Sequence, residues 1–128
     1  MQRKVSTVSR YLLGLLFFVF GAAGLFNLLP PPPDMPQDMQ TFMSGLLATK
    51  YFFPLLKLTE TICGLLLLIG VVPALALIIL APVSLNIFLL HAFVTPGLQN
   101  LIVPLLILTL HGLSAINYAS VYRPLFRK

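Results

Sequence analysis

Four long apolar runs constrain the fold of this sequence more than any other feature. They cover residues 11–29, 51–70, 73–94 and 98–118, and a Gly or Pro lies at or near each break between them. At 1.5 Å per residue, a helix of about 20 residues crosses the roughly 30 Å hydrocarbon core of a bilayer. The pattern therefore predicts an all-α polytopic membrane protein: a bundle of four transmembrane helices in a single domain over residues 1–128.

The composition agrees with this prediction. Apolar residues make up 59% of the chain and charged residues only 9%, with a mean hydropathy of +1.00. That leaves too little polar surface to cover a water-soluble globule. The net charge of +5 does not indicate a nucleic-acid partner, because the basic residues gather at the two termini beside apolar runs. The expected surroundings are the lipid bilayer.

The first run could open a signal peptide, but it continues to Leu29, beyond a usual signal core, which favours a retained helix. Pro30 to Pro33 should end that helix, and residues 30–50 should form an external Pro-rich loop. Within this loop Met39–Thr49 is mildly amphipathic and predicts a short interfacial helix.

Two further features predict how the helices pack. Gly70–Val72 leaves almost no connection before Pro73, so the helices at 51–70 and 73–94 should form an antiparallel hairpin. In the first run three glycines fall near one helical face, against which another helix could pack closely. They are Gly14, Gly21 and Gly24.

The basic residues also predict orientation. Four spans place both termini on one side of the membrane, and the termini hold most of the Lys and Arg residues. These are Arg3, Lys4, Arg10, Arg123, Arg127 and Lys128. No Lys or Arg lies between Leu29 and Thr49. By the positive-inside rule, both termini should be cytoplasmic and the loop 30–50 external.

Polar residues inside the apolar runs are the candidate functional residues. Lys57 and Glu60 are three apart, so they share a helical face and can partly neutralise each other. Counting 1.5 Å per residue places Asn86 of the next helix at about the same depth, roughly 10 Å below the outer boundary. Asn86 is expected to hydrogen-bond the pair across the hairpin, whereas His91 should lie near the outer rim.

Two interpretations of this cluster stay open. Lys57, Glu60 and Asn86 could form an interhelical clamp that sets the register of the bundle, or the floor of an outward-opening pocket for a ligand or a proton. His111 is a second candidate, although a satisfied core imidazole explains it more simply. Cys63, the only cysteine, should pack as a small apolar residue. No Cys and His cluster has metal-ligand spacing, so no metal site is expected.

The stretch Tyr51–Leu67, YFFPLLKLTETICGLLL, resembles the DoxX family of small membrane proteins. The resemblance continues through Pro73, Ala81-Pro82, Asn86, His91-Ala-Phe and the ending Tyr122–Phe126. It implies a four-helix, multi-pass protein of the bacterial inner membrane. It also carries over Lys57, Glu60, Gly64, Asn86 and His91 as family-pattern positions. The family is named after a subunit associated with a quinone-linked oxidase, and some relatives are linked to thiol-oxidant defence.

Three functions follow as hypotheses, and the sequence does not decide whether the protein is an enzyme. The first is an accessory subunit of a membrane redox system that binds a quinone or lipid beside Lys57, Glu60 and Asn86. The second is a small proton-coupled carrier. The third is a structural or assembly partner without a ligand, possible also as a homo-oligomer. The sequence has no haem, flavin, iron–sulfur or zinc signature, so any cofactor stays unidentified.

Overall fold

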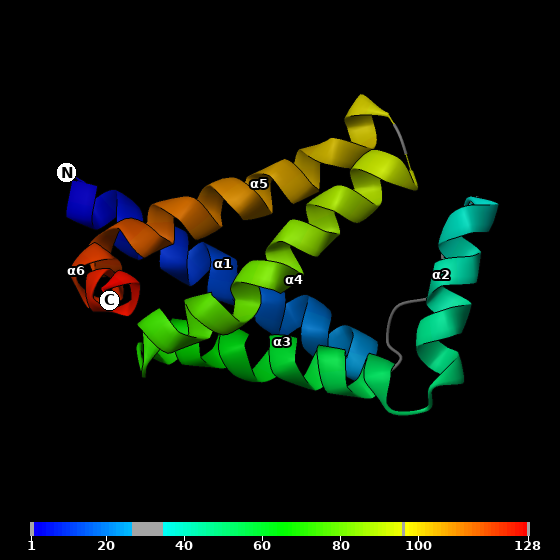
Figure 1. Ribbon diagram of the computed structural model, residues 1–128, viewed down its shortest axis with the longest axis horizontal. Coiled ribbons are helices and arrows are strands. Elements are labelled where there is room, and N and C mark those ends of the chain that lie inside the picture. The colour runs from blue at the N-terminus through cyan, green and yellow to red at the C-terminus, as the bar shows by residue number, and fades with distance from the viewer. Residues whose placement is uncertain (1, 27–34, 96, 128) are drawn as a thin grey trace.

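The computed structural model describes residues 2–26, 35–95 and 97–127, and its regular structure in these ranges is helical. The elements are α1 (Gln2–Leu25), α2 (Gln37–Ala48), α3 (Phe52–Ile69), α4 (Pro73–Phe93), α5 (Leu98–Ala115), η1 (Ile116–Tyr118), α6 (Ala119–Tyr122) and η2 (Arg123–Phe126). In Figure 1 the long helices form a bundle, and α2 stands beside the end opposite to the chain termini. The all-α prediction is confirmed.

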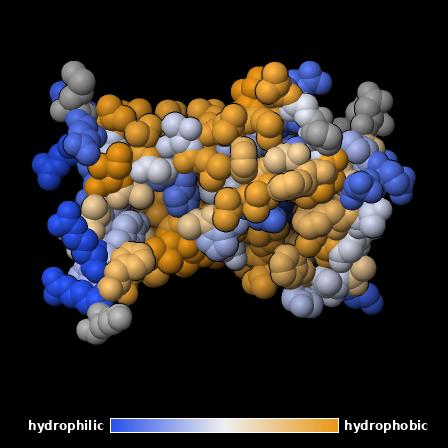
Figure 2. Space-filling view, turned by 45° about the horizontal axis from the view of Figure 1, so that its top comes forward, coloured by the Kyte–Doolittle hydropathy of each residue, from blue (hydrophilic) through white to orange (hydrophobic). Residues whose placement is uncertain are grey.

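Four helices are long and apolar enough to cross a membrane: α1, α3, α4, and α5 with its continuation to Phe126. Apolar surface covers the middle of the molecule in Figure 2, and hydrophilic residues gather at both ends. Large apolar side chains such as Leu15, Ile62 and Ile79 point outward with 50%, 49% and 41% of their surface exposed. Water would penalise such a belt, whereas lipid tails cover it. The predicted four-helix membrane bundle is therefore confirmed.

The closest helix pair is α1 with α3, which run antiparallel and make the most extensive contact in the bundle. A Cβ added at Gly14 would lie 2.9 Å from the carbonyl oxygen of Gly64, and one added at Gly21 would lie 2.7 Å from the backbone nitrogen of Thr61. Only a glycine hydrogen fits at these points, so the two backbones approach closely. The predicted glycine face is confirmed, with α3 as its partner.

The turn between α3 and α4 is as short as predicted. Gly70 adopts a left-handed conformation with φ of 74°, and the N–H groups of Gly70 and Val71 both donate to the carbonyl of Leu66. This closes the helix in the way that a C-terminal glycine allows. Pro73 then opens α4, where its missing N–H costs nothing. Figure 1 shows α4 diverging from α3 beyond the turn, and α4 packs more extensively against α5.

The core lies where α1, α3, α4 and α5 meet. Its buried apolar residues are Leu13, Phe17, Cys63, Leu67, Ala76, Leu77, Leu80, Ile107 and Leu110. Cys63 is only 3% exposed, which confirms its predicted role as a packed apolar residue.

Both ends of the chain lie at the same end of the bundle, as four spans require (Figure 1). The hydroxyl of Ser6 donates to the carbonyl of Ser114 at 3.0 Å, and the amide of Asn117 donates to the carbonyl of Arg3 at 3.4 Å. These bonds tie the start of α1 to the end of α5 and to η1. Which side of the membrane this end faces stays a prediction.

Some predicted boundaries are wrong. The first helix was expected over residues 11–29, but α1 already begins at Gln2, because residues 2–10 contain no Gly or Pro and include the good helix formers Gln, Arg and Lys. Residues 27–29, and the prolines expected to end the helix, lie outside the described residues. The loop 30–50 contains α2, which confirms the short helix with a start slightly before Met39. Beyond Tyr118, helical turns continue to Phe126.

Candidate functional site

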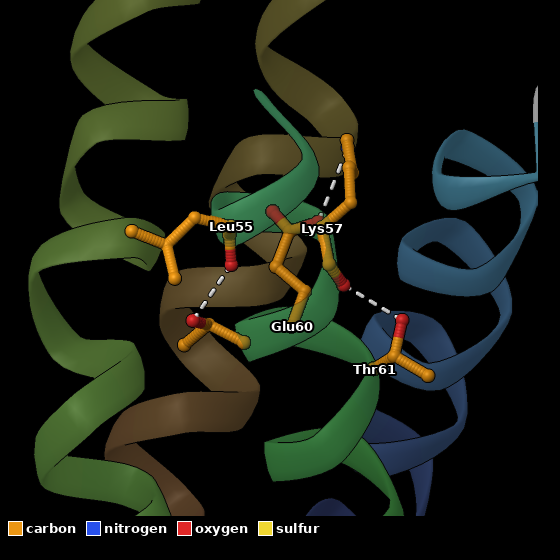
Figure 3. Close-up of polar contacts among 5 residues, drawn as sticks. Leu55, Lys57, Glu60 and Thr61 are labelled. Carbon is orange, nitrogen blue, oxygen red and sulfur yellow. Dashed lines mark hydrogen bonds and ion pairs between the residues drawn. The ribbon is translucent and has the colours of Figure 1, made fainter. Parts of the chain in front are cut away.

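Lys57 and Glu60 form an ion pair on α3, as their spacing predicts. The ammonium nitrogen of Lys57 lies 3.1 Å from Oε2 of Glu60. The Glu60 side chain is only 6% exposed, while that of Lys57 is 21% exposed. In Figure 3 the neighbouring hydroxyl of Thr61 is directed to the backbone carbonyl of Lys57, at 2.7 Å, and not to the carboxylate. A buried carboxylate is thus neutralised by an ammonium of its own helix that reaches toward the boundary of the bundle.

The glycines of α1 provide the surface on which this pair rests. A Cβ added at Gly24 would lie 2.7 Å from Cδ of Lys57, and one added at Gly21 would lie 3.0 Å from Cβ of Glu60. The lysine stem therefore lies against bare backbone. The ammonium also lies 5.6 Å from the ring centroid of Phe53, within the range of a cation–π attraction. Any larger residue at either glycine would displace one member of the pair.

Among the described residues, both members of this ion pair belong to α3, and no ion pair links them to another helix. The contact with another helix that the structure does show is the packing of its carbon atoms on α1, so the clamp interpretation stays open in that form.

The structure does not join Asn86 or His91 to this pair by a hydrogen bond. Asn86 is exposed on α4, and no hydrogen bond links its amide to Lys57 or Glu60. The expected bond across the hairpin is therefore absent from the described residues. His91 is half-buried, and its Nδ1 lies 2.8 Å from the carbonyl oxygen of Ile87, in the preceding turn of the same helix.

His111 takes part in an interhelical contact. Its Nδ1 lies 3.0 Å from the hydroxyl oxygen of Ser84, which is fully buried on α4. Ser114, one turn further along α5, is also fully buried, and its hydroxyl donates to the carbonyl of Leu110 at 2.6 Å. His111 thus has a hydrogen-bond partner inside the bundle, as the simpler interpretation of this residue requires.

The family model named DoxX matches residues 5–94, which is more than half of the sequence. The protein belongs to the DoxX family. No curated protein and no solved structure matches it.

The DoxX match helps to rank the candidates. It covers α1 from its fourth residue onward and all of α2 to α4, and so includes Lys57, Glu60, Asn86 and His91, but it ends before His111. The close contacts of Gly14, Gly21 and Gly24 with α3 therefore lie within the DoxX match. The Ser84–His111 contact joins this region to a helix outside it.

Sequence reasoning missed a polar contact at the terminal end of this DoxX protein. Arg10, treated as part of a basic tail, is half-buried, and its Nη1 donates to the hydroxyl of Tyr118 at 3.2 Å. A Cβ at Gly70 would lie 3.5 Å from the same guanidinium, so Arg10 sits beside the C-terminal end of α3. A positive charge is favourable at that position. The available signal was that Arg10 directly precedes Tyr11 and the first apolar run.

Proposed function

We propose that this DoxX protein is an accessory subunit of a membrane redox system in the bacterial inner membrane, and that it binds the head group of a quinone beside Lys57 and Glu60. The observation that carries the proposal is the burial of the Glu60 carboxylate beside its ionic partner. Its carboxylate is buried, and its ionic partner is an ammonium that remains partly exposed. An ionisable pair inside a membrane span is costly and indicates a functional site.

The hydrogen-bonding capacity of the pair suits such a head group. An ammonium has three donors and a carboxylate about four acceptor positions, and the salt bridge uses one of each. Lys57 can donate to a ring carbonyl, and Glu60 can accept from a ring hydroxyl. Phe53, whose ring already lies near the ammonium, provides an aromatic face.

The surroundings also favour an amphipathic ligand that arrives from the bilayer. Next to the pair, α3 exposes Leu58 and Ile62 by 44% and 49%, so an apolar tail could remain in lipid while the head group meets Lys57. A quinone supplies two-electron, two-proton redox chemistry when bound. In this proposal Lys57 orients the head group, and the Glu60 carboxylate is the group that can accept a proton from it.

Gentle purification followed by mass spectrometry of co-purifying small molecules and proteins tests the proposal. The test variant is the double substitution Lys57→Met, Glu60→Leu. Lys57→Met alone leaves the buried carboxylate unpaired and should destabilise the protein by about 3–5 kcal/mol. Glu60→Leu alone leaves the partly exposed ammonium unpaired and should cost less, whereas the double variant should recover stability. Lys50→Met is the matched control, because it removes an exposed lysine outside the spans.

The parent and Lys50→Met proteins should retain a quinone, and the stable double variant should lose it. A quinone kept by the double variant at the parental ratio would show that the pair is not the binding site. If every form carries a partner protein and none carries a small molecule, the protein is an assembly partner instead. A lipid lost together with the pair would replace the quinone as the ligand.

A further inference from the structure

Two open grooves meet at Arg3, near the start of α1. The first has a volume of about 640 Å³ and lies between α1 and η1, with Gln2, Asn117 and Tyr118 among its lining residues. The second, of about 360 Å³, continues along α1 past Lys4, Val8 and Tyr11. Arg3 lines both, so they form one surface, which we call the α1–η1 groove.

Hydrogen bonds hold the backbone of this groove in place. The carbonyl of Arg3 accepts from the hydroxyl of Thr7 at 2.9 Å and from the amide of Asn117 at 3.4 Å. The Arg3 backbone is thereby tied both to its own helix and to η1. Its guanidinium is left exposed, because these bonds use only the main chain.

The positive charge at the groove has no counterion within residues 2–26, 35–95 and 97–127. Arg3 and Lys4 are exposed, and the only ion pair in those ranges is the distant one between Lys57 and Glu60. The remaining described acid, Asp38, belongs to α2 at the opposite end of the bundle (Figure 1). An anion from outside the described chain could therefore neutralise the positive charges of Arg3 and Lys4.

Beyond Arg3 and Lys4, α1 exposes a strip of apolar side chains that an acyl chain could cover. Along one face of α1, Lys4 is followed by Val8, Tyr11, Leu12 and Leu15, whose exposed fractions are 55%, 46%, 48% and 50%. A basic side chain at the start of the helix is thus followed by apolar side chains with one aromatic residue, Tyr11, among them, which suits a phosphate above and an acyl chain below. A free inorganic anion would use the charges but not the apolar strip.

We propose that the α1–η1 groove binds an anionic phospholipid. Its phosphate lies between Arg3 and Lys4, and an acyl chain lies along the apolar strip of α1. The arginine fork matches phosphate geometry, and the amides of Gln2 and Asn117 can donate to glycerol or phosphate oxygens. The site is distinct from the quinone position, because Gly24 beneath Lys57 lies about 30 Å from Arg3 along α1.

Quenching by brominated lipid tests this proposal directly. The chain contains no tryptophan, so Leu12→Trp gives a single reporter one turn below Val8. The protein is reconstituted in phosphatidylcholine vesicles that contain brominated phosphatidylglycerol, and then in vesicles in which the phosphatidylcholine carries the bromine instead. The quenching in the two preparations gives the relative binding constant of the two lipids at the reporter. A preference for phosphatidylglycerol is expected.

Each basic residue near an anionic lipid strengthens binding about fivefold. In the reporter background, Arg3→Gln with Lys4→Gln should lower the preference at least about fivefold. The control, Arg123→Gln with Arg127→Gln, removes the same charge at the same end and should leave most of the preference intact. The substituted side chains are exposed, so both variants should fold.

Three results would overturn the proposal. The first is equal quenching by the two brominated lipids, and the second is equal loss of preference in the test and control variants. The third is loss of the preference when inorganic phosphate replaces chloride at constant ionic strength, which would mean that the groove binds a free anion.

Discussion

Gly64 offers the sharpest test of the bundle, because its environment fixes the expected magnitude. A Cβ added at Gly64 would lie 2.8 Å from the carbonyl oxygen of Gly14 and closer still to the backbone nitrogen of Phe18. Ordinary contact begins near 3.4 Å, so Gly64→Ala must push α1 and α3 apart by about half an ångström or more. Such a gap loses about a quarter to a half of each dispersion contact along the interface.

The opposing atoms are backbone and cannot rotate away, so the cost should lie in the upper part of the usual 1–3 kcal/mol for overpacking. Alanine recovers about 1 kcal/mol of helix propensity, which leaves a net destabilisation of about 1–2 kcal/mol. Gly112→Ala is the matched control, because a Cβ there meets no atom within 4 Å. That variant should keep the full gain in helix propensity and be about 1 kcal/mol more stable than the parent.

The free energy of unfolding can be measured by titrating SDS into mixed micelles and following far-UV circular dichroism. We expect Gly64→Ala to be about 2–3 kcal/mol less stable than Gly112→Ala, the sum of the two opposite effects. Equal stability of the two variants would refute the reasoning, since the α1–α3 contact would then tolerate a methyl group at its closest point.

Three further predictions concern other parts of the chain. With the single native cysteine replaced by alanine, a cysteine at Gln37 should react with an impermeant maleimide in intact spheroplasts and one at Gln2 should not; the opposite labelling would invert the orientation. Ser84→Ala removes the contact to His111 and should lower the free energy of unfolding by about 0.6 kcal/mol, the usual value for an interhelical bond in membranes; a loss above about 2 kcal/mol would indicate a larger network. Tyr122→Phe removes a 2.9 Å bond to the first turn of α4 and should speed amide exchange over residues 119–126, whereas unchanged exchange would show that the bond does not hold α6.

The helices were predictable because run length, Pro and Gly report directly on spans and breaks. The glycine face of α1 was also predictable from spacing, but its partner was not. The short turn at Gly70 predicts a hairpin of α3 and α4, but it does not show that α3 packs more extensively on α1, where Gly64 allows a close approach. A glycine inside an apolar run is visible in a sequence, but the helix that will face it is not.

The sequence also predicts one part of the candidate site and not another. The Lys57–Glu60 pair depends only on spacing within one helix, and the sequence predicts it correctly. Counting residues estimated the depth of Asn86, but depth does not give rotation about the helix axis, and Asn86 is exposed. Its rotation depends on how α4 diverges toward α5, which is a property of the whole bundle.

The pairing of α1 with α3 has a consequence for biosynthesis. The glycine face of α1, on which Lys57 and Glu60 pack, is synthesised before them. It can already be in the membrane when they emerge from the ribosome. A lysine inside a span opposes insertion, by up to about 2.5–3.5 kcal/mol at the centre of the helix. A helix already present with bare backbone at Gly21 and Gly24 lowers that barrier by covering the pair. Enlarging both glycines should therefore leave α3 uninserted in part of the nascent chains, which protease accessibility during in vitro translation would detect. Normal insertion of such chains would show that α3 enters the bilayer without help from α1.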